Sequence, residues 1–149
     1  MSVSDVLQPV VNGVRTNFLT AKAAGQHMIR QGSGVILAFG GSGDPMPGFN
    51  LGGLQVGFQA IDALFRQFAA ELGPHGVRVL TLQTAGVPES IPESFAAREA
   101  ITRDTVDRTL LGRAATLADV GNAAVFAASD WSAAMTATSL NITCGTEVG

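Results

Sequence analysis

The hydrophobic positions of the chain fall at helical spacing in some segments and in short unbroken runs in others. Residues 10–30 carry a helical apolar pattern, formed by Val11, Val14, Phe18, Ala21 and Met28. Residues 54–72 carry a second apolar stripe at alternating steps of four and three, formed by Leu54, Phe58, Ile61, Phe65, Phe68 and Leu72. Both patterns predict amphipathic helices with one face turned to a core.

Three short segments predict strands. Residues 35–39 form an apolar run between glycines, which is typical of a strand buried on both faces. Residues 77–82 follow a Gly/Pro break, and residues 138–143 include alternating polar and apolar positions. Because a helix separates each strand from the next, the order implies parallel strands joined by crossovers. We therefore expect an α/β/α fold of three layers, with about three parallel strands flanked by helices.

The segment between the second and third strands has the least regular pattern. Residues 87–113 mix prolines, charges and short apolar groups, which predicts one or two short helices outside the sheet. Thr116 and Asp119 then have the spacing of a helix cap, and we expect a helix from there to about Ser129. Residues 40–53 are rich in glycine and proline and predict a loop, so we expect one domain over residues 1–149.

Composition narrows the function classes. With 46% hydrophobic and 14% charged residues the chain can form a globular core. Its net charge is −3 and its nine basic residues do not cluster, which argues against binding to nucleic acid or anionic lipid. No apolar run approaches the roughly 20 residues that span a bilayer. The single cysteine and the N-terminal sequence give no sign of secretion, so we expect a cytoplasmic protein.

Four isolated residues favour structural roles over chemistry. His27 and His75 have no Cys or Asp companions at ligand spacing, so no metal site is expected. Cys144 has no histidine partner that the sequence singles out, which favours a small buried thiol. Trp131 follows Ser-Asp and is interpreted as a packed or interface aromatic.

The order of elements and several motifs resemble the C-terminal half of short-chain dehydrogenases/reductases. The resemblance covers nearly the whole chain and rests on short stretches in order, namely residues 12–24, the strand and glycine/serine loop at 34–43, residues 69–79, Asp119-Val120, residues 126–130, Met135-Thr136 and Cys144-Gly145. It implies a Rossmann-like half-fold, which would be a truncated form of the family's single domain. It also implies NAD(P)-dependent oxidoreductase chemistry for the family.

Two positions of the family's catalytic set are lost in this sequence. The resemblance at residues 69–79 places the family's Tyr at Leu54 and its Lys at Phe58. The family's chemistry needs a phenol that exchanges a proton and a cation that lowers the phenol's pKa, and hydrocarbon side chains do neither. The chain has no tyrosine, and its one lysine, Lys22, belongs to a different helix. No catalytic residue is therefore expected.

The other two members of the set are also changed. The family's Ser falls at Gly41 with Ser42 adjacent, and its Asn falls near Gly13 with Asn12 adjacent. A shift of one residue would restore either hydrogen-bonding group. The candidates for a residual pocket are therefore Asn12, Ser42, Asp44 and Thr84.

The sequence also lacks the family's dinucleotide signals. The glycine-rich turn that holds the dinucleotide in the family would precede Met1. Residues 40–43 are glycine-rich but lack the lysine and helix signature of a phosphate loop, so a strand-exit loop is favoured. The Pro-Gly that follows the second strand in the family is Thr84-Ala85-Gly86 here. We expect no cofactor on the isolated chain, and NAD(P) enters by resemblance only.

An open edge on the strand at 35–39 predicts association, because an apolar edge aggregates unless another chain covers it. In the family the counterparts of the first two helices pack on those of a second subunit. We expect a homodimer or higher homo-oligomer, or a complex with a full-length relative. The favoured function is a catalytically degenerate structural or regulatory subunit. The alternatives are the C-terminal part of a split NAD(P)-dependent oxidoreductase completed by another chain, and a pocket that binds an apolar ligand without reaction.

Overall fold

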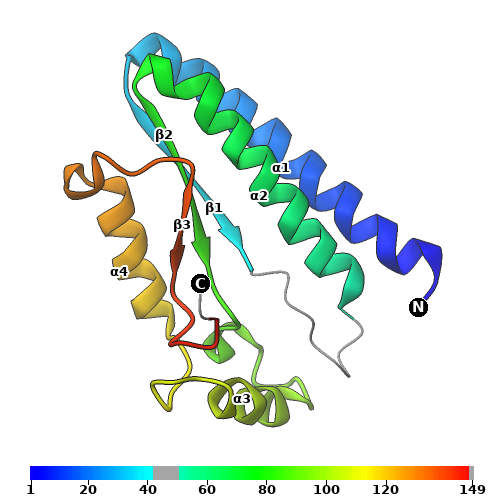
Figure 1. Cartoon of the computed structure of the whole chain (residues 1–149). Coiled ribbons are helices and arrows are strands. Elements are labelled where there is room, and N and C mark those ends of the chain that lie inside the picture. The colour runs from blue at the N-terminus through cyan, green and yellow to red at the C-terminus, as the bar shows by residue number, and fades with distance from the viewer. Residues whose placement is uncertain (42–50, 148–149) are drawn as a thin grey trace.

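A computed structural model describes residues 1–41 and 51–147 and shows three parallel strands flanked by helices (Figure 1). In chain order the main elements are α1 (Val3–Gln31), β1 (Gly34–Gly40), α2 (Gly52–Leu72), β2 (Val77–Gln83), α3 (Arg98–Asp107), α4 (Leu117–Ala128) and β3 (Thr138–Asn141). The expected α/β/α class and all three strands are confirmed. Residues 87–113, whose mixed composition predicts one or two short helices, contain the short 3-10 helix Pro88–Ser90 and α3.

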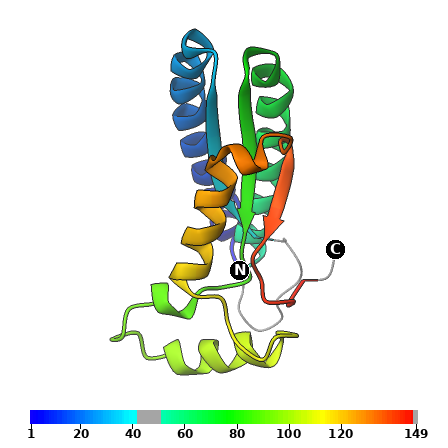
Figure 2. The same ribbon diagram turned by 90° about the vertical axis from the view of Figure 1, so that its left-hand side faces the viewer.

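The sheet has the order β1-β2-β3, and both pairs are parallel. Its register runs from Gly34 opposite Val77 to Gly40 opposite Gln83, while β3 pairs with the second half of β2. Helices α1 and α2 lie together on one face and α4 lies on the other (Figures 1 and 2). As the central strand, β2 is the most completely buried of the three. Within the described residues β1 has no strand on its outer side.

Helix α1 begins at Val3, earlier than the apolar pattern predicts. A reciprocal cap sets this start, because the Ser2 hydroxyl accepts from the Asp5 amide at 3.2 Å and the Asp5 carboxylate accepts from the Ser2 amide at 2.6 Å. The helix ends as predicted at glycine, with Gly32 in the left-handed region at a φ of 72°.

No helix of the described residues is long and apolar enough to cross a membrane.

Helix α4 begins with the predicted cap. The Thr116 hydroxyl accepts from the Asp119 amide at 3.0 Å, and the Asp119 carboxylate accepts from the Thr116 amide at 2.9 Å. The same carboxylate pairs with Arg113 at 2.6 Å. Hydrogen bonds from Arg113 first, and then from Thr116, hold the pKa of Asp119 well below its ordinary value.

Strand β3 is shorter than the predicted 138–143 and ends at Asn141. The Asn141 side-chain oxygen accepts from the backbone amide of Thr143 at 3.1 Å and from its hydroxyl at 2.6 Å. The backbone amide of Ile142 still donates to the Gln83 carbonyl oxygen of β2 at 2.8 Å. The chain therefore turns at Thr143, directly after the last hydrogen bond to β2.

The two long helices approach most closely at two glycines of α2. A Cβ on Gly53 would lie 2.6 Å from the Asp5 carbonyl oxygen and 2.8 Å from the Val6 Cα, and one on Gly57 would lie 3.7 Å from the Pro9 carbonyl oxygen. Both glycines are buried, whereas Leu54 is 41% exposed. The expected stripe through Leu54 and Phe58 is thus wrong for the first turns of α2, although Ile61, Phe65, Phe68 and Leu72 are buried as predicted.

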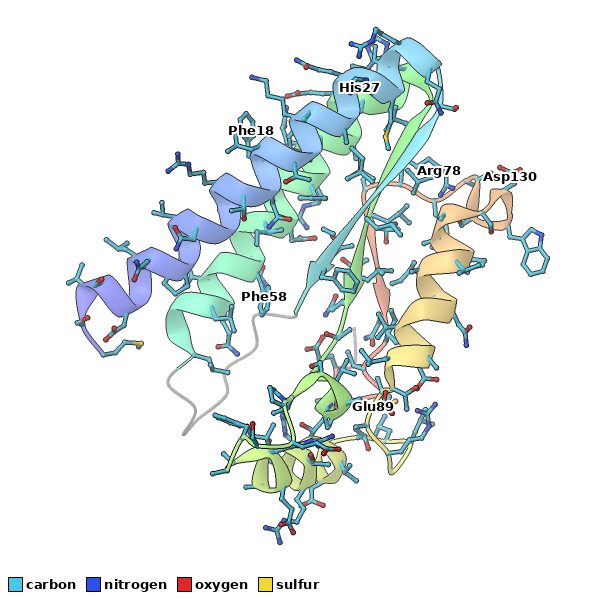
Figure 3. All side chains as sticks on the ribbon, turned by 180° about the vertical axis from the view of Figure 1, so that it is seen from behind. Phe18, His27, Phe58, Arg78, Glu89 and Asp130 are labelled. Atoms are coloured by element: carbon cyan, nitrogen blue, oxygen red, sulfur yellow. The ribbon has the colours of Figure 1, made fainter. Side chains whose placement is uncertain are left out.

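Arg78 hydrogen-bonds the central strand, β2, to the end of α4 and to the segment that follows it. Its guanidinium group donates to the carbonyl oxygens of Ala127 at 3.0 Å, Ser129 at 3.0 Å and Ser132 at 3.1 Å, and to the Ser132 hydroxyl at 3.0 Å. Two of these acceptors, on Ala127 and Ser129, lie at the carboxyl end of α4, where a positive charge is favourable. Figure 3 shows Arg78 beside this segment, which leads into β3.

We predict that Gly53→Ala lowers the free energy of unfolding by roughly 1–3 kcal/mol, since backbone atoms of α1 occupy the space of the new methyl group. The matched control is Gly121→Ala in α4, where a Cβ meets nothing within 4 Å. The control should gain up to about 1 kcal/mol from helix propensity. Urea unfolding measures both, and equal effects of the two substitutions would contradict the close approach.

Arg78→Lys should lower the free energy of unfolding by about 2–3 kcal/mol, because an ammonium group cannot reach all the acceptors that the guanidinium fork satisfies. Arg66→Lys is the control, since Arg66 is largely exposed and forms a surface ion pair with Asp62 at 2.7 Å. Urea unfolding again provides the measurement. A loss no larger than that of the control would show that the Arg78 contacts contribute little.

Candidate functional site

The carboxyl ends of β1 and β2 open onto a hollow of about 830 Å³. Four positions that the sequence singles out line it together, namely Gly41, Leu54, Phe58 and Thr84. They come from the end of β1, the first turns of α2 and the end of β2. Its outer wall comes from α3 and the start of α4. Ligands of open α/β sheets bind at this end of the strands, so this hollow is the candidate site.

Leu54 and Phe58 face the hollow because of the way α2 packs. Each residue of a helix is turned by about 100° from the one before it. Gly53 and Gly57 face α1, so the following residues are turned toward the end of β1. Phe58 points from α2 to that end of the sheet (Figure 3). At the two positions matched to the family's Tyr and Lys, the hollow is therefore lined by hydrocarbon.

Gly41 and Phe58 fit each other. A Cβ on Gly41 would lie 2.9 Å from both the Cδ2 and the Cε2 atoms of the Phe58 ring. The aromatic ring therefore takes the room into which a side chain at position 41 would project. A serine at 41, which the family pattern has, could not enter without moving the ring.

Two positions that the sequence singles out, Gly13 and Asn12, lie away from this hollow, and two others are outside the described residues. Gly13 faces α2, where a Cβ would lie 3.2 Å from the Ile61 Cδ1 atom. Asn12 is exposed on α1 and lines neither this hollow nor the second one described below. Since Asn12 lies outside both of these linings, its role as a pocket residue stays a prediction. Ser42 and Asp44 fall outside the residues that the structure describes.

Most polar side chains of the hollow are bonded to their own neighbours. Arg108 pairs with Asp104 at 2.9 Å, and the Thr105 hydroxyl donates to the Ile101 carbonyl oxygen at 2.8 Å. Glu147 accepts from the Gln83 side chain. Among the described residues, the Thr84 hydroxyl has no hydrogen-bond partner. The surface left for a ligand is mainly apolar.

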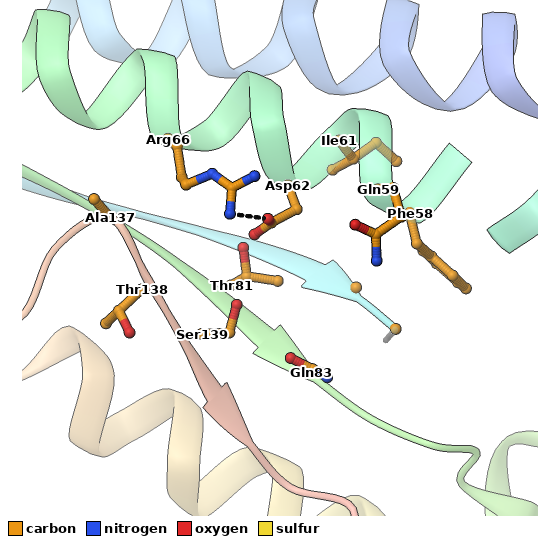
Figure 4. A pocket seen from close by; sticks show the side chains of 12 residues that line it. Phe58, Gln59, Ile61, Asp62, Arg66, Thr81, Gln83, Ala137, Thr138 and Ser139 are labelled. Atoms are coloured by element: carbon orange, nitrogen blue, oxygen red, sulfur yellow. Dashed lines mark ion pairs between the residues drawn. The ribbon is translucent and has the colours of Figure 1, made fainter. Parts of the chain in front are cut away.

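A second, polar hollow of about 220 Å³ lies between α2 and the sheet (Figure 4). Its lining includes the Asp62–Arg66 ion pair of α2, at 2.7 Å, and the hydroxyls of Thr81 on β2 and Ser139 on β3. Gly41 and Phe58 line this hollow as well as the larger one. The sequence analysis missed it. The available signal was Thr81, a polar residue within an otherwise apolar run of β2.

The remaining candidates do not join either hollow. The His27 side chain contacts Arg30 on the same helix at 2.8 Å. Cys144 is half-buried, so the interpretation as a buried thiol is only partly correct. Trp131 is 89% exposed and does not pack within the chain, which removes one of its two interpretations. Within residues 1–41 and 51–147, no three His, Cys, Asp or Glu side chains gather as metal ligands.

Comparison with known solved structures shows the same fold. Sorbitol-6-phosphate 2-dehydrogenase from Erwinia amylovora matches with a TM-score of 0.87 and 22% identity, over 100% of this chain and 62% of its own. An enoyl-(acyl-carrier-protein) reductase from Anaplasma phagocytophilum, solved in complex with NAD, matches with a TM-score of 0.76 and 23% identity, over 89% of this chain and 50% of its own.

Sequence comparison identifies the family. The family described as enoyl-(acyl carrier protein) reductase matches residues 5–147. The NADH-dependent enoyl-[acyl-carrier-protein] reductase of Bacillus subtilis is 30% identical over 138 residues, which are 91% of this chain and 53% of that protein. A short-chain dehydrogenase reductase of Arabidopsis thaliana is 32% identical, over 85% of this chain and 50% of its own. The chain thus spans about half the length of these relatives, and it belongs to the enoyl-(acyl carrier protein) reductase family of the short-chain dehydrogenases/reductases.

Proposed function

We propose that this chain is a catalytically degenerate member of its family and acts as an oligomerising structural or regulatory subunit. The observation that carries the proposal is the hydrocarbon lining of the hollow at Leu54 and Phe58. Neither side chain can exchange a proton or carry a positive charge, so neither can do the work of the family's Tyr and Lys. The ring of Phe58 also excludes a side chain at Gly41, the position matched to the family's Ser.

The lysine of the chain supports this proposal by its position. The Lys22 ammonium lies 5.5 Å from the centre of the Phe18 ring on α1. Phe18 in turn stacks on Phe68, near the far end of α2 from Phe58, with ring centres 5.9 Å apart. Lys22 is not part of the hollow, and the sequence holds no tyrosine that a rearrangement could bring there.

The outer face of α1 supports assembly. Leu7, Val11 and Phe18 are spaced by four and seven residues, so they follow one stripe of the helix, and all three are exposed. A second copy of the chain is the proposed occupant, because a two-fold axis would place the same apolar stripe on both sides of the contact. The one acidic residue of α1, Asp5, does not interrupt this stripe, since it is engaged in the helix cap.

A second candidate function is completion by another chain that carries a dinucleotide site. Strand β1 has no strand on its outer side within the described residues, and Phe39 near its end is 64% exposed. An unpaired edge of seven residues can accept a strand from a partner. The relatives are about twice as long as this chain, which is consistent with a missing neighbour for that edge.

We expect no micromolar binding of NAD(H) or NADP(H) to the isolated chain, measured by isothermal titration calorimetry. The physical reason is that the larger hollow offers a mainly apolar surface. The enoyl-(acyl-carrier-protein) reductase of Anaplasma phagocytophilum is a positive control, since its structure contains NAD. Micromolar affinity would contradict the first proposal. Nicotinamide turnover after co-expression with a dinucleotide-binding chain would favour the second.

The assembly proposal predicts a dimer or larger oligomer of the purified chain at micromolar concentration in native mass spectrometry. The double variant Leu7→Glu/Val11→Glu should weaken association by about a hundredfold or more, because each two-fold contact would bury unpaired charges. Val125→Glu, at an exposed position of α4, is the control and should leave the oligomer unchanged. A monomeric wild type, or equal effects of both variants, would reject the α1 contact.

A further inference from the structure

We propose that the two hollows form one binding site for an amphipathic small molecule, with its apolar body in the larger hollow and a small, uncharged, hydrogen-bonding head in the polar one. The inference goes beyond the proposed function, because an assembly subunit needs no ligand. It rests on the opposite chemistry of the two linings and on the two residues that they share, Gly41 and Phe58.

The larger hollow suits an apolar body. Its volume of about 830 Å³ lies within the range of small-molecule sites. Phe39, Leu54, Ile101 and Val120 present hydrocarbon to it. Arg108 and Asp104 form an ion pair at 2.9 Å, and the Glu147 carboxylate accepts from the Gln83 side chain. A molecule that fills this space would be held mainly by burial of its apolar surface.

The polar hollow suits a neutral head because the charges of Asp62 and Arg66 are paired and the Thr81 hydroxyl is available. Asp62 and Arg66 form an ion pair at 2.7 Å. Thr81 is only 6% exposed, and its hydroxyl has no hydrogen-bond partner among the described residues. Figure 4 shows this hydroxyl directed from β2 toward the Asp62 side chain across the hollow. Among the described residues no fully buried side-chain oxygen lacks a partner, so water reaches this hydroxyl from the hollow, and a ligand that replaces the water can bond to it.

The Phe58 ring stands between the two hollows. It lines both, together with Gly41, and its contact with the backbone depends on the missing side chain at that position. A ligand that extends past this ring can place its apolar end in the larger hollow and its polar end in the polar hollow. A purely apolar molecule would leave the Thr81 hydroxyl unbonded, and a purely polar one would leave the larger hollow to water.

Decane-1,2-diol is a suitable probe, and 1,2-dimethoxydecane has the same chain with a head that cannot donate hydrogen bonds. Isothermal titration calorimetry of the full chain should give saturable binding of one diol per chain, tighter than that of the diether. Thr81→Val should weaken binding of the diol by roughly two- to tenfold, as expected for one hydrogen bond. Thr81→Ser keeps the hydroxyl and should bind the diol as the wild type does.

Gly41→Ala tests the part of the lining that the two hollows share. Its methyl group would meet the Phe58 ring at 2.9 Å and push the ring into one of the hollows, so binding of both probes should weaken by roughly fivefold or more. Val125→Ala on α4, outside both linings, should change neither affinity. Thermal unfolding of every variant confirms that it is folded.

Absence of saturable diol binding by the wild type would overturn the proposal. Equal affinities of the wild type, Thr81→Val and Gly41→Ala would also overturn it, because they would indicate adsorption to the exposed face of α1. Several probe molecules per chain would have the same meaning. Loss of diol binding in Thr81→Ser as large as the loss in Thr81→Val would reject the hydrogen bond and with it the polar half of the site.

Discussion

The close approach of α2 to α1 at Gly53 is the constraint on which the candidate site depends. The α1 backbone leaves no room for a side chain at Gly53, so α2 can pack only with this glycine and Gly57 turned inward. The next residues are then directed away from α1, and Leu54 and Phe58 line the hollow at the end of the sheet. One helix contact thus sets both the helix layer and the lining of the site.

The lining forms a consistent set of residues. Phe58 can lie against the end of β1 because position 41 is glycine, and a side chain there would require the ring to move. The residues at 41 and 58 are therefore compatible with each other, and the return of a serine at 41 alone is incompatible with the present position of the ring. This coupling is more informative about the hollow than the loss of either residue considered separately.

The sequence allowed much of the fold and part of the site to be predicted. The helical stripe from Ile61 to Leu72 and the cap at Thr116 are confirmed, because spacing and capping depend on residues close together in the chain. Alignment of the family pattern brought Gly41, Leu54 and Phe58 to the correct end of the sheet. It did not bring Asn12 to either hollow, because the direction of that side chain depends on how α1 turns toward α2. It also gave no indication of the polar hollow, which needs the register of β2 and β3.

Taken by itself, the sequence determined the order of helices and strands, the cap at Thr116, and the lack of a tyrosine, since these depend on composition or on a few neighbouring residues. Only the tertiary structure decided which face of α2 is buried, since Gly53 and not Leu54 meets the α1 backbone. It also decided the partners of Arg78, whose acceptors lie 49 to 57 residues away. The physical reason is that packing and hydrogen bonds between distant segments depend on distances that local spacing does not encode.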